Sequence, residues 1–570
     1  MSTLAYTPLE EIEKIRAELQ TGFNSGKTKS VAFRKYQLLQ FAYLIQDNVK
    51  AFEDALASDL GRHALETNLL EIGASLSEIM DAYKNVESWA KPEKPALTLT
   101  WMFMRPTVLK EPKGVVLIIS PFNYPLWLCV SPMCGAIAAG NAIVIKPSES
   151  CPAIAALLTE LIPKYLDPSL VRVVNGAIPE TTKVRSKHTT LAFKLLTFFS
   201  CLNSLGVISF IRGTRALGGL SQPPLHRPSR LYLWSSEENR PSLWIPPPTC
   251  SSQRSASFGG KFTNGGQTCV APDYVLVPKE AQEPLIDAMK SVYTNFYPET
   301  TGESPTPPQN VTKLVHHGAF NRVNGLVQNT KGTIVVGGQN DEATKYFAPT
   351  IVRDVQLNDS LMSEEIFGPV LPIVPVENVD AGLAYVNSHD HPLALYVFSQ
   401  NEAYKNKVFN STQSGSAVAN ETIVIPGVTG LPFGGIGPSG CKFFYLLLRF
   451  FSHAHSWIPH WQGKFRPNTF FVPIVISLQQ YGFDMFTHLR ASIDAPGWID
   501  KVFNFRFPPY TTSNIAKMKA RLGAKLPPRP TGPPPGTVAS RGGKWFLLAF
   551  VVAILGALTK MKNRMPFVKE

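Results

Sequence analysis

The chain has 570 residues, a formal net charge of +13, and 44% hydrophobic and 17% charged residues. This length is sufficient for two or more domains, and the apolar content is ordinary for a globular protein. Seven cysteines without closely spaced pairs argue against a disulfide scaffold and favour a reducing compartment.

The positive charge is concentrated in two segments. Residues 184–258 carry a net charge of +7 and residues 441–480 a net charge of +4, which leaves +2 for the rest of the chain. A strongly basic protein at first suggests nucleic acid or an anionic membrane as a partner. Neither segment has a nucleic-acid-binding pattern, so we expect no nucleic-acid partner.

The first part of the chain predicts helices. Within residues 8–92, apolar residues recur at helical spacing with charged residues between them, as in 38–48 and 65–73. Pro92 and the prolines and threonines after it end this pattern. We expect these helices to contribute packing, and residues 101–105 to form a short strand.

An alternation of strands and helices follows. Residues 114–120 and 142–146 are continuous aliphatic runs, typical of strands buried in a parallel sheet. The small residues at 135–140 predict a helix between them, and another helix follows the second strand. This order predicts a doubly wound α/β sheet. Ligands bind such sheets beyond the carboxyl ends of the strands, where Asn123 and Lys146 fall.

The glycine-rich turn Gly-Gly-Lys-Phe-Thr-Asn-Gly-Gly-Gln-Thr-Cys ends at Cys269. A cysteine is a nucleophile only as the thiolate, and an open turn leaves its sulfur reachable and near backbone N–H groups. We expect Gly265 and Gly266 to let a substrate or cofactor approach the backbone. The alternative is that Cys269 is one more buried cysteine with a structural role.

Strand-like and helical stretches alternate again over residues 273–440, including strands at 274–277 and 333–338. Residues 363–372 form an acidic turn followed by Gly-Pro, which on its own is typical of a surface loop. The glycines of 431–440 suit close backbone packing and carry no chemistry themselves.

Several of these motifs resemble, in the same order, those of the aldehyde dehydrogenase superfamily. They are Asn-Tyr-Pro at 123–125, Lys-Pro-Ser-Glu at 146–149, the turn that ends at Cys269, Ser-Glu-Glu-Ile-Phe-Gly-Pro at 363–369 and Leu-Pro-Phe-Gly-Gly at 431–435. Residues 369–376 and 392–399 resemble the class 3 branch, which includes the fatty aldehyde dehydrogenases.

The resemblance covers residues 8–183, 260–440 and 481–525. It implies an α/β fold with a doubly wound, Rossmann-type cofactor domain that lacks the Gly-x-Gly-x-x-Gly fingerprint, an α/β catalytic domain and a C-terminal tail helix. It also implies a homodimer.

The resemblance implies that medium- or long-chain aldehydes are oxidised to carboxylic acids with NAD(P). The Cys269 thiolate adds to the aldehyde carbonyl, and the Asn123 amide, together with the Cys269 backbone N–H, stabilises the oxyanion, an interaction worth about 3 kcal/mol in comparable sites. Hydride loss leaves a thioester, which water hydrolyses with the help of a general base.

Four further residues match the cofactor contacts of the family. By this resemblance Lys146 and Glu149 hydrogen-bond the adenosine ribose, Glu365 holds the nicotinamide ribose and Phe367 packs near the nicotinamide. A carboxylate at Glu149 suits the free 2′-hydroxyl of NAD better than a 2′-phosphate, because like charges repel. We expect NAD as the cofactor, with NADP as the alternative. No metal site is expected, since the histidines of 441–480 lack a ligand pattern.

Two segments depart from the family, at 184–258 and 441–480. The first shows no clear strand–helix alternation and lacks the phosphate-side glycine turn and the Glu-Leu-Gly-Gly-Lys motif with its catalytic glutamate. Glu237 and Glu238 do not match that motif, so the general base stays unassigned. The abrupt return at Gly260 favours a retained intron or a shifted reading frame over an evolved insertion.

Two alternatives therefore stay open. The first is a catalytically impaired, membrane-anchored relative that acts as a binding protein, because the catalytic glutamate motif is absent. The second is a relative that passes its acyl group to another acceptor, such as coenzyme A.

The end of the chain predicts a membrane tail. Residues 527–543 form a Pro-rich linker. Within the predicted tail anchor, 544–560, the uncharged and mostly apolar run 545–559 is flanked by Lys544 and Lys560. The apolar run would be about 22 Å long as a helix, short against a hydrocarbon core of about 30 Å, but flanking lysines and local thinning can close that gap. A docking helix is the alternative. The tail predicts a cytosol-facing protein on the endoplasmic reticulum, the mitochondrial outer membrane or lipid droplets.

The expected domain organisation follows from these boundaries. It comprises a cofactor domain (1–183), an aberrant segment replacing part of it (184–258), a catalytic domain (259–440), a second aberrant segment (441–480), a C-terminal oligomerisation region (481–526), the linker (527–543) and the tail anchor (544–560).

Overall fold

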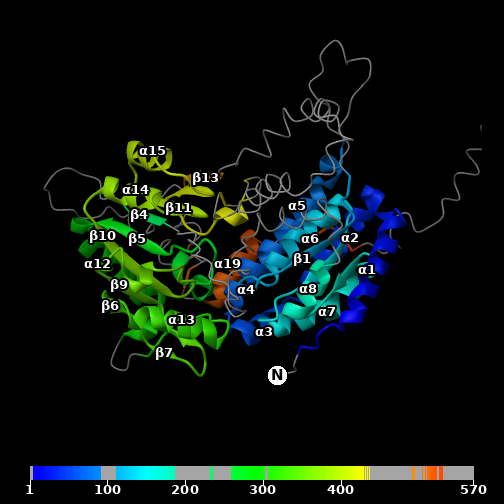
Figure 1. Cartoon of the computed structure of the whole chain (residues 1–570), viewed down its shortest axis with the longest axis horizontal. Coiled ribbons are helices and arrows are strands. Elements are labelled where there is room, and N and C mark those ends of the chain that lie inside the picture. The colour runs from blue at the N-terminus through cyan, green and yellow to red at the C-terminus, as the bar shows by residue number, and fades with distance from the viewer. Residues whose placement is uncertain are drawn as a thin grey trace, which may run out of the picture.

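The computed structural model describes residues 4–91, 111–186, 231–234, 259–301, 306–428, 491–494, 510–522 and 526–529, with a few single residues between 431 and 508. These residues form two lobes, each built on its own sheet (Figure 1). The predicted strand at 101–105 and the predicted tail anchor lie outside the described residues.

The N-terminal lobe begins with helices, as the periodicity of residues 8–92 predicted. They are α1 (Leu9–Asn24), α2 (Val31–Asp47), α3 (Val49–Leu60), α4 (Ala64–Thr67) and α5 (Ala74–Trp89). A π-helical turn, Asn68–Gly73, joins α4 to α5. Gly61 ends α3 with a φ of 61°, the left-handed conformation that glycine adopts at a helix C-terminus.

Three parallel strands form the sheet of this lobe within the described residues. They lie in the order β1 (Val115–Ile119), β2 (Ala142–Lys146), β3 (Val171–Val173), connected by α6 (Trp127–Ala139) and α7 (Pro152–Tyr165) and followed by α8 (Ile178–Ser186). The predicted strand–helix alternation is confirmed. Ile119 pairs with Lys146, so the loop after β1 and the end of β2 lie at the same edge of the sheet.

The C-terminal lobe contains an eight-stranded sheet within the described residues. Its order is β13-β12-β11-β4-β5-β10-β9-β6, and neighbours are parallel except the antiparallel pair β6–β9. The strands are β4 (Leu231–Trp234), β5 (Tyr274–Pro278), β6 (Thr333–Val336), β9 (Thr350–Arg353), β10 (Val370–Val376), β11 (Ala394–Phe398), β12 (Ser416–Ala419) and β13 (Ala491–Asp494). A short hairpin, β7 (Asn340–Asp341) and β8 (Tyr346–Phe347), stands apart.

Strand β4 lies within residues 184–258, the segment for which the sequence showed no clear strand–helix alternation. It pairs with β11 on one side and with β5 on the other. Its sequence, Leu-Tyr-Leu-Trp, has strand propensity, but Pro- and Ser-rich neighbours hid that signal. This part of the segment therefore belongs to the sheet of the C-terminal lobe.

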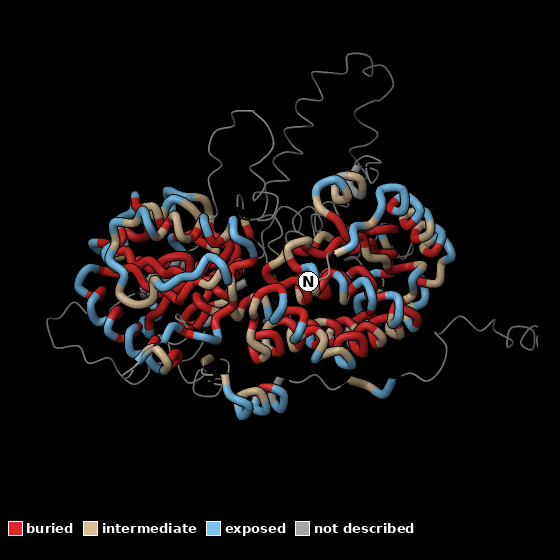
Figure 2. Tube along the Cα trace, turned by 90° about the horizontal axis from the view of Figure 1, so that it is seen from below, coloured by how far each residue is buried: buried red, intermediate tan, exposed pale blue. Residues whose placement is uncertain are grey.

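Side chains of the large sheet alternate between two apolar cores, as strand geometry requires. Val275 and Val277 pack with α12 (Gln282–Phe296), and Cys269 joins this cluster. Tyr274 and Leu276 pack in the opposite cluster, with α13 (His317–Gln328), α14 (Val379–Asn387) and α15 (Glu402–Asn410). Figure 2 shows buried residues concentrated inside both lobes.

The C-terminal helix α19 (Thr512–Leu522) is mostly exposed. Within the described part of the chain, no helix has the length and apolar character needed to cross a membrane. Short 3-10 turns occupy Lys27–Lys29, Thr263–Gly266, Lys279–Ala281, Pro298–Thr300, Ser360–Met362 and Ile425–Gly427.

Candidate functional site

The turn before Cys269 packs tightly against the protein's own backbone. Gly265 and Gly266 have φ values of 59° and 72°. A Cβ on Gly265 would lie 2.4 Å from the carbonyl oxygen of Thr312, and a Cβ on Gly266 would lie 2.1 Å from that of Gly368. These glycines therefore let neighbouring carbonyl groups of the chain approach closely, and the approach of a ligand to the turn stays a prediction.

Hydrogen bonds on both sides of Cys269 hold this turn in place. The Gln267 side chain donates to the Lys313 carbonyl at 3.0 Å and accepts from the Val315 N–H at 3.0 Å. The Tyr396 hydroxyl donates to the Val270 carbonyl at 2.6 Å. Cys269 itself is 9% exposed. The structure therefore presents this cysteine from a rigid turn at the edge of an apolar core.

Asn123 lies in the loop after β1, close to that turn. Its carbonyl oxygen accepts hydrogen bonds from Arg62 Nη2 at 2.7 Å and from Asn264 Nδ2 at 2.8 Å. Among the described residues, none forms a hydrogen bond with the Asn123 side-chain amide, although Asn123 is only 5% exposed. These hydrogen bonds hold the backbone of the loop, while the Asn123 side-chain amide remains able to donate to an acceptor outside the described residues.

A direct contact joins the neighbours of the two predicted catalytic residues. The Tyr124 hydroxyl and Thr268 Oγ1 are 2.5 Å apart, and these residues flank Asn123 and Cys269 in sequence. Burial raises the pKa of the Tyr124 phenol, so this hydroxyl stays neutral at physiological pH. The structure thus brings Asn123 and Cys269 into adjacent loops from opposite lobes.

Lys146 and Glu149 form an ion pair at the carboxyl end of β2. The Lys146 side chain is 2% exposed and that of Glu149 is 25% exposed. The pair offers an ammonium donor and a carboxylate acceptor at the edge of a parallel sheet, which is where such sheets bind nucleotides. This donor set fits the hydroxyl groups of a ribose.

The loop of Glu365 and Phe367 reaches the same edge from the C-terminal lobe. The Phe367 ring meets the Phe122 ring edge to face, with centroids 5.9 Å apart. Phe367 has a φ of 43°, a conformation that is strained for a non-glycine residue and marks functional loops. Phe122 precedes Asn123, so the predicted nicotinamide contact lies beside the predicted oxyanion loop.

Charged side chains hold the Glu365 loop, and two of them, Asp273 and Lys261, are buried. Arg322 donates to the carbonyls of Glu365 and Ile366, at 2.9 and 2.5 Å. The Asp273 carboxylate accepts from the Ile366 N–H at 3.1 Å and lies 3.7 Å from Lys261 Nζ. Because Lys261 belongs to the nucleophile turn, this chain of contacts connects the turn to the cofactor loop.

Arg62, Glu66 and Glu71 are buried beside the site, although the N-terminal helices were expected to contribute only packing. Arg62 pairs with Glu71, and Glu66 accepts from the Asn264 N–H at 3.3 Å and the Thr312 hydroxyl at 2.6 Å. The sequence carried no signal for them, because arginine and glutamate side chains are mostly solvent-exposed.

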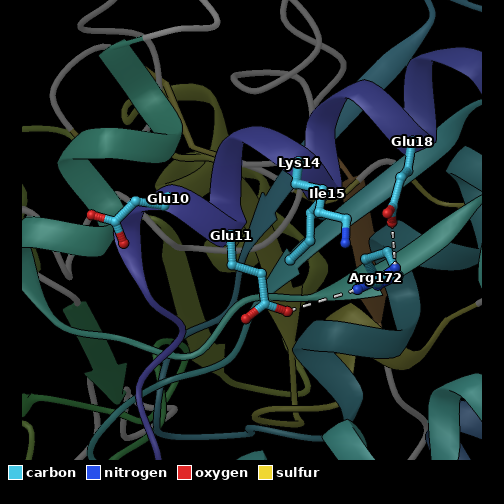
Figure 3. A pocket seen from close by; sticks show the side chains of 6 residues that line it. All are labelled: Glu10, Glu11, Lys14, Ile15, Glu18 and Arg172. Carbon is cyan, nitrogen blue, oxygen red and sulfur yellow. Dashed lines mark hydrogen bonds and ion pairs between the residues drawn. The ribbon is translucent and has the colours of Figure 1, made fainter.

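A separate pocket of about 390 Å³ lies between α1 and β3 (Figure 3). It is lined by Glu10, Glu11, Lys14, Ile15, Glu18 and Arg172. Arg172 pairs with Glu18 at 2.7 Å and with Glu11 at 4.0 Å. None of the predicted site residues lines this pocket.

Other candidates lie beyond what the structure describes. Glu237, Glu238 and the histidines of 441–480 are outside the described residues. Within the described residues, no group of three or more His, Cys, Asp or Glu side chains could hold a metal ion.

Comparisons with known proteins agree with this geometry. The model of the aldehyde dehydrogenase family matches residues 1–198 and 251–445, and its gap falls inside the predicted departure at 184–258. Aldehyde dehydrogenase family 3 member B1 of Rattus norvegicus is 34% identical over 89% of this chain and 96% of its own length. Family 3 member A2 of Mus musculus is 34% identical over 89% and 93%.

Solved structures show the same fold. The substrate-bound AldH of Staphylococcus aureus is 32% identical, with a TM-score of 0.63 over 75% of this chain and 89% of its own. A Mycobacterium tuberculosis aldehyde dehydrogenase complexed with NAD+ is 21% identical, with a TM-score of 0.60 over 76% and 86%. The chain therefore belongs to the aldehyde dehydrogenase family, as an NAD(P)-dependent oxidoreductase that converts aldehydes to carboxylic acids.

Proposed function

We propose that Cys269 is the nucleophile and Asn123 the oxyanion donor of this oxidation. The observation that carries the proposal is the Tyr124–Thr268 contact of 2.5 Å, which ties the loop of Asn123 to the turn of Cys269. The Asn123 amide, without a partner among the described side chains and main-chain groups, supplies the donor that an oxyanion needs.

The chemistry follows from these positions. The Cys269 thiolate adds to the aldehyde carbonyl, and the new tetrahedral oxygen accepts hydrogen bonds from the Asn123 amide and the Cys269 N–H. Bound NAD(P) supplies the hydride acceptor. The Cys269 thioester is then cleaved by water, which forms the carboxylic acid and restores the thiol. A general base takes the proton of that water.

We assign the cofactor contacts to four residues. Lys146 and Glu149 hold the adenosine ribose, because their ion pair offers both a donor and an acceptor at the strand ends. Glu365 holds the nicotinamide ribose, and Phe367, which meets Phe122 across the two lobes, packs near the nicotinamide. The domain boundaries at 183/184 and 258/259 separate the cofactor and catalytic parts.

The substrate that we propose is a medium- or long-chain aliphatic aldehyde at a membrane surface. The class 3 motifs and the similarity to family 3 members support this class. The apolar run at 545–559, preceded by a Pro-rich linker and flanked by Lys544 and Lys560, supports a tail anchor on a cytosol-facing membrane. A relative from Rattus norvegicus that is 37% identical is described as dimeric and NADP-preferring, which supports a homodimer.

Steady-state kinetics with a series of aliphatic aldehydes tests this proposal. We expect wild-type protein to form NADH, with kcat/KM rising with chain length. Cys269→Ser should abolish turnover while NAD binding, measured by quenching of protein fluorescence, stays intact. Asn123→Ala should lower kcat by roughly 10²–10³-fold, the usual cost of one oxyanion donor. Undiminished turnover in Cys269→Ser would refute the assignment.

A further inference from the structure

Arg62 is a buried arginine that joins three separate segments. It is 1% exposed, in the short loop between α3 and α4. Its Nη1 pairs with Glu71, while its Nη2 donates to the Asn123 carbonyl at 2.7 Å and to Asn264 Oδ1 at 2.5 Å. One guanidinium therefore contacts the N-terminal helices, the oxyanion loop and the nucleophile turn.

Glu71 anchors this guanidinium within the N-terminal lobe. Its second carboxylate oxygen accepts from the Trp127 N–H at 2.6 Å, at the start of α6. Burial raises the pKa of Glu71, and the charge of Arg62 opposes that rise. A buried pair of this kind holds a fixed arrangement, because separating its members leaves an uncompensated buried charge.

Asn264 completes a triangle with Arg62 and Asn123. Its Nδ2 donates to the same Asn123 carbonyl at 2.8 Å, and its φ of 57° is a left-handed conformation that asparagine tolerates. Arg62 also lies over the Tyr124 ring, 5.2 Å from its centroid, and the Tyr124 hydroxyl contacts Thr268. Every member of this group therefore lies in, or directly contacts, one of the two catalytic loops.

We propose that Arg62 is a positioning residue that fixes the Asn123 loop against the Cys269 turn. The inference rests on the roles proposed above for Asn123 and Cys269. Arg62 does not touch the reacting atoms, and it acts by keeping the oxyanion donor at the correct spacing from the sulfur. The planar guanidinium suits this task because it directs several N–H groups in fixed directions, whereas a lysine ammonium is a compact point charge on a flexible stem.

Two variants remove this contact in different ways. Arg62→Lys keeps a positive charge beside Glu71 but loses the planar guanidinium with its several N–H donors. Arg62→Met/Glu71→Gln removes both charges, so no unpaired buried charge threatens the fold. Arg34→Met is the matched control, since Arg34 is 7% exposed and donates to the carbonyls of Thr28 and Ala138 in the same lobe.

We expect both Arg62 variants to lower kcat by roughly 10²-fold, the effect of misplacing a reacting group by about 1 Å. The Kd of NAD should be unchanged, because Lys146 and Glu149 stay in place. Arg34→Met should lose thermal stability and keep its kcat. Wild-type kcat in both Arg62 variants would overturn the proposal.

A double-mutant cycle with Asn123→Ala separates positioning from a general structural effect. If Arg62 acts through Asn123, Arg62→Lys lowers kcat in the wild-type background and adds little in the Asn123→Ala background. An equal loss in both backgrounds overturns the positioning role and leaves the proposed function standing. Wild-type kcat in Asn123→Ala overturns the proposed function itself, so the two failures are distinguishable.

Discussion

Glu149 places a carboxylate at the proposed site of the adenosine ribose. A 2′-phosphate there would meet a like charge, whereas a 2′-hydroxyl would donate to it. We expect Glu149→Gln to raise the ratio of kcat/KM for NADP to that for NAD by about 10-fold, which corresponds to one like-charge interaction of roughly 1.4 kcal/mol. Steady-state kinetics with each cofactor measures the ratio.

A matched control for this variant is Glu160→Gln. Glu160 is an exposed glutamate on α7 that pairs with Lys164 at 2.5 Å, away from the strand ends. Glu160→Gln should leave the ratio of kcat/KM for NADP to that for NAD unchanged. The same result in Glu149→Gln would contradict the contact of Glu149 with the ribose.

Gly266 is a residue of the nucleophile turn at which a side chain has no room. A Cβ there would lie 2.1 Å from the Gly368 carbonyl oxygen, on a backbone with a φ of 72°. We expect Gly266→Ala to lower the free energy of unfolding by more than about 2 kcal/mol, because both strain and overlap oppose it. Urea denaturation measures this loss.

Gly325 offers the contrasting position. It lies in α13, and a Cβ there would meet nothing within 4 Å. Gly325→Ala should leave stability unchanged or raise it by up to about 1 kcal/mol, as alanine does inside a helix. Equal effects of the two substitutions would show that the contact with Gly368 is unimportant.

At the scale of elements, two helices begin with a histidine that acts as an N-cap. Nδ1 of His63 accepts from the Leu65 N–H at 3.1 Å at the start of α4, and Nδ1 of His316 accepts from the Ala319 N–H at 2.9 Å at the start of α13. This role needs a neutral ring. Burial lowers the pKa of both histidines, so the unfolded chain binds more protons than the folded one just below pH 6.5.

The sign of the pH dependence follows. The contribution of these caps is present above the unfolded pKa of about 6.5 and is lost as the pH falls through the lowered folded pKa. We expect His63→Asn/His316→Asn, which keeps a capping acceptor without a titrating group, to lose less stability between pH 7.5 and 5.5 than wild type. Urea titrations at both pH values measure this, and identical losses would contradict the cap account.

The sequence predicted those helices and strands that a local pattern of residues encodes. Strands β1 and β2 were predicted because they are continuous aliphatic runs, and α2 because of its helical periodicity. Strand β4 was not predicted, since four residues between Pro-rich stretches carry little local signal. The roles of Arg62 and Gly266 depend on contacts with residues far away in the sequence, and no local pattern encodes such contacts. The candidate site residues came from the resemblance of their motifs.

At the scale of the whole molecule, residues 526–529 dock on α2 of the N-terminal lobe. Arg529 pairs with Asp47 and lies over the Tyr43 ring, 4.4 Å from its centroid, and the Tyr43 hydroxyl donates to the Pro527 carbonyl. The chain therefore enters the Pro-rich linker from a defined face of the enzyme.

Truncation after residue 543 tests the tail. We expect the shortened protein to move from the membrane to the soluble fraction, because the apolar run that would insert is gone. Its kcat/KM for a short, water-soluble aldehyde should equal that of the full chain, since the site lies between the two lobes. A truncated protein that still sediments with membranes contradicts the anchor.

The central claim is that Cys269 carries the acyl group during aldehyde oxidation. The most direct measurement is a single turnover of the full chain with a long-chain aldehyde and NAD, quenched in acid and mapped by peptide mass spectrometry. The account predicts an acyl thioester on the peptide that contains Cys269, and neither thioester nor NADH in Cys269→Ser. NADH formation by Cys269→Ser, or an acyl group on a different cysteine, would contradict it.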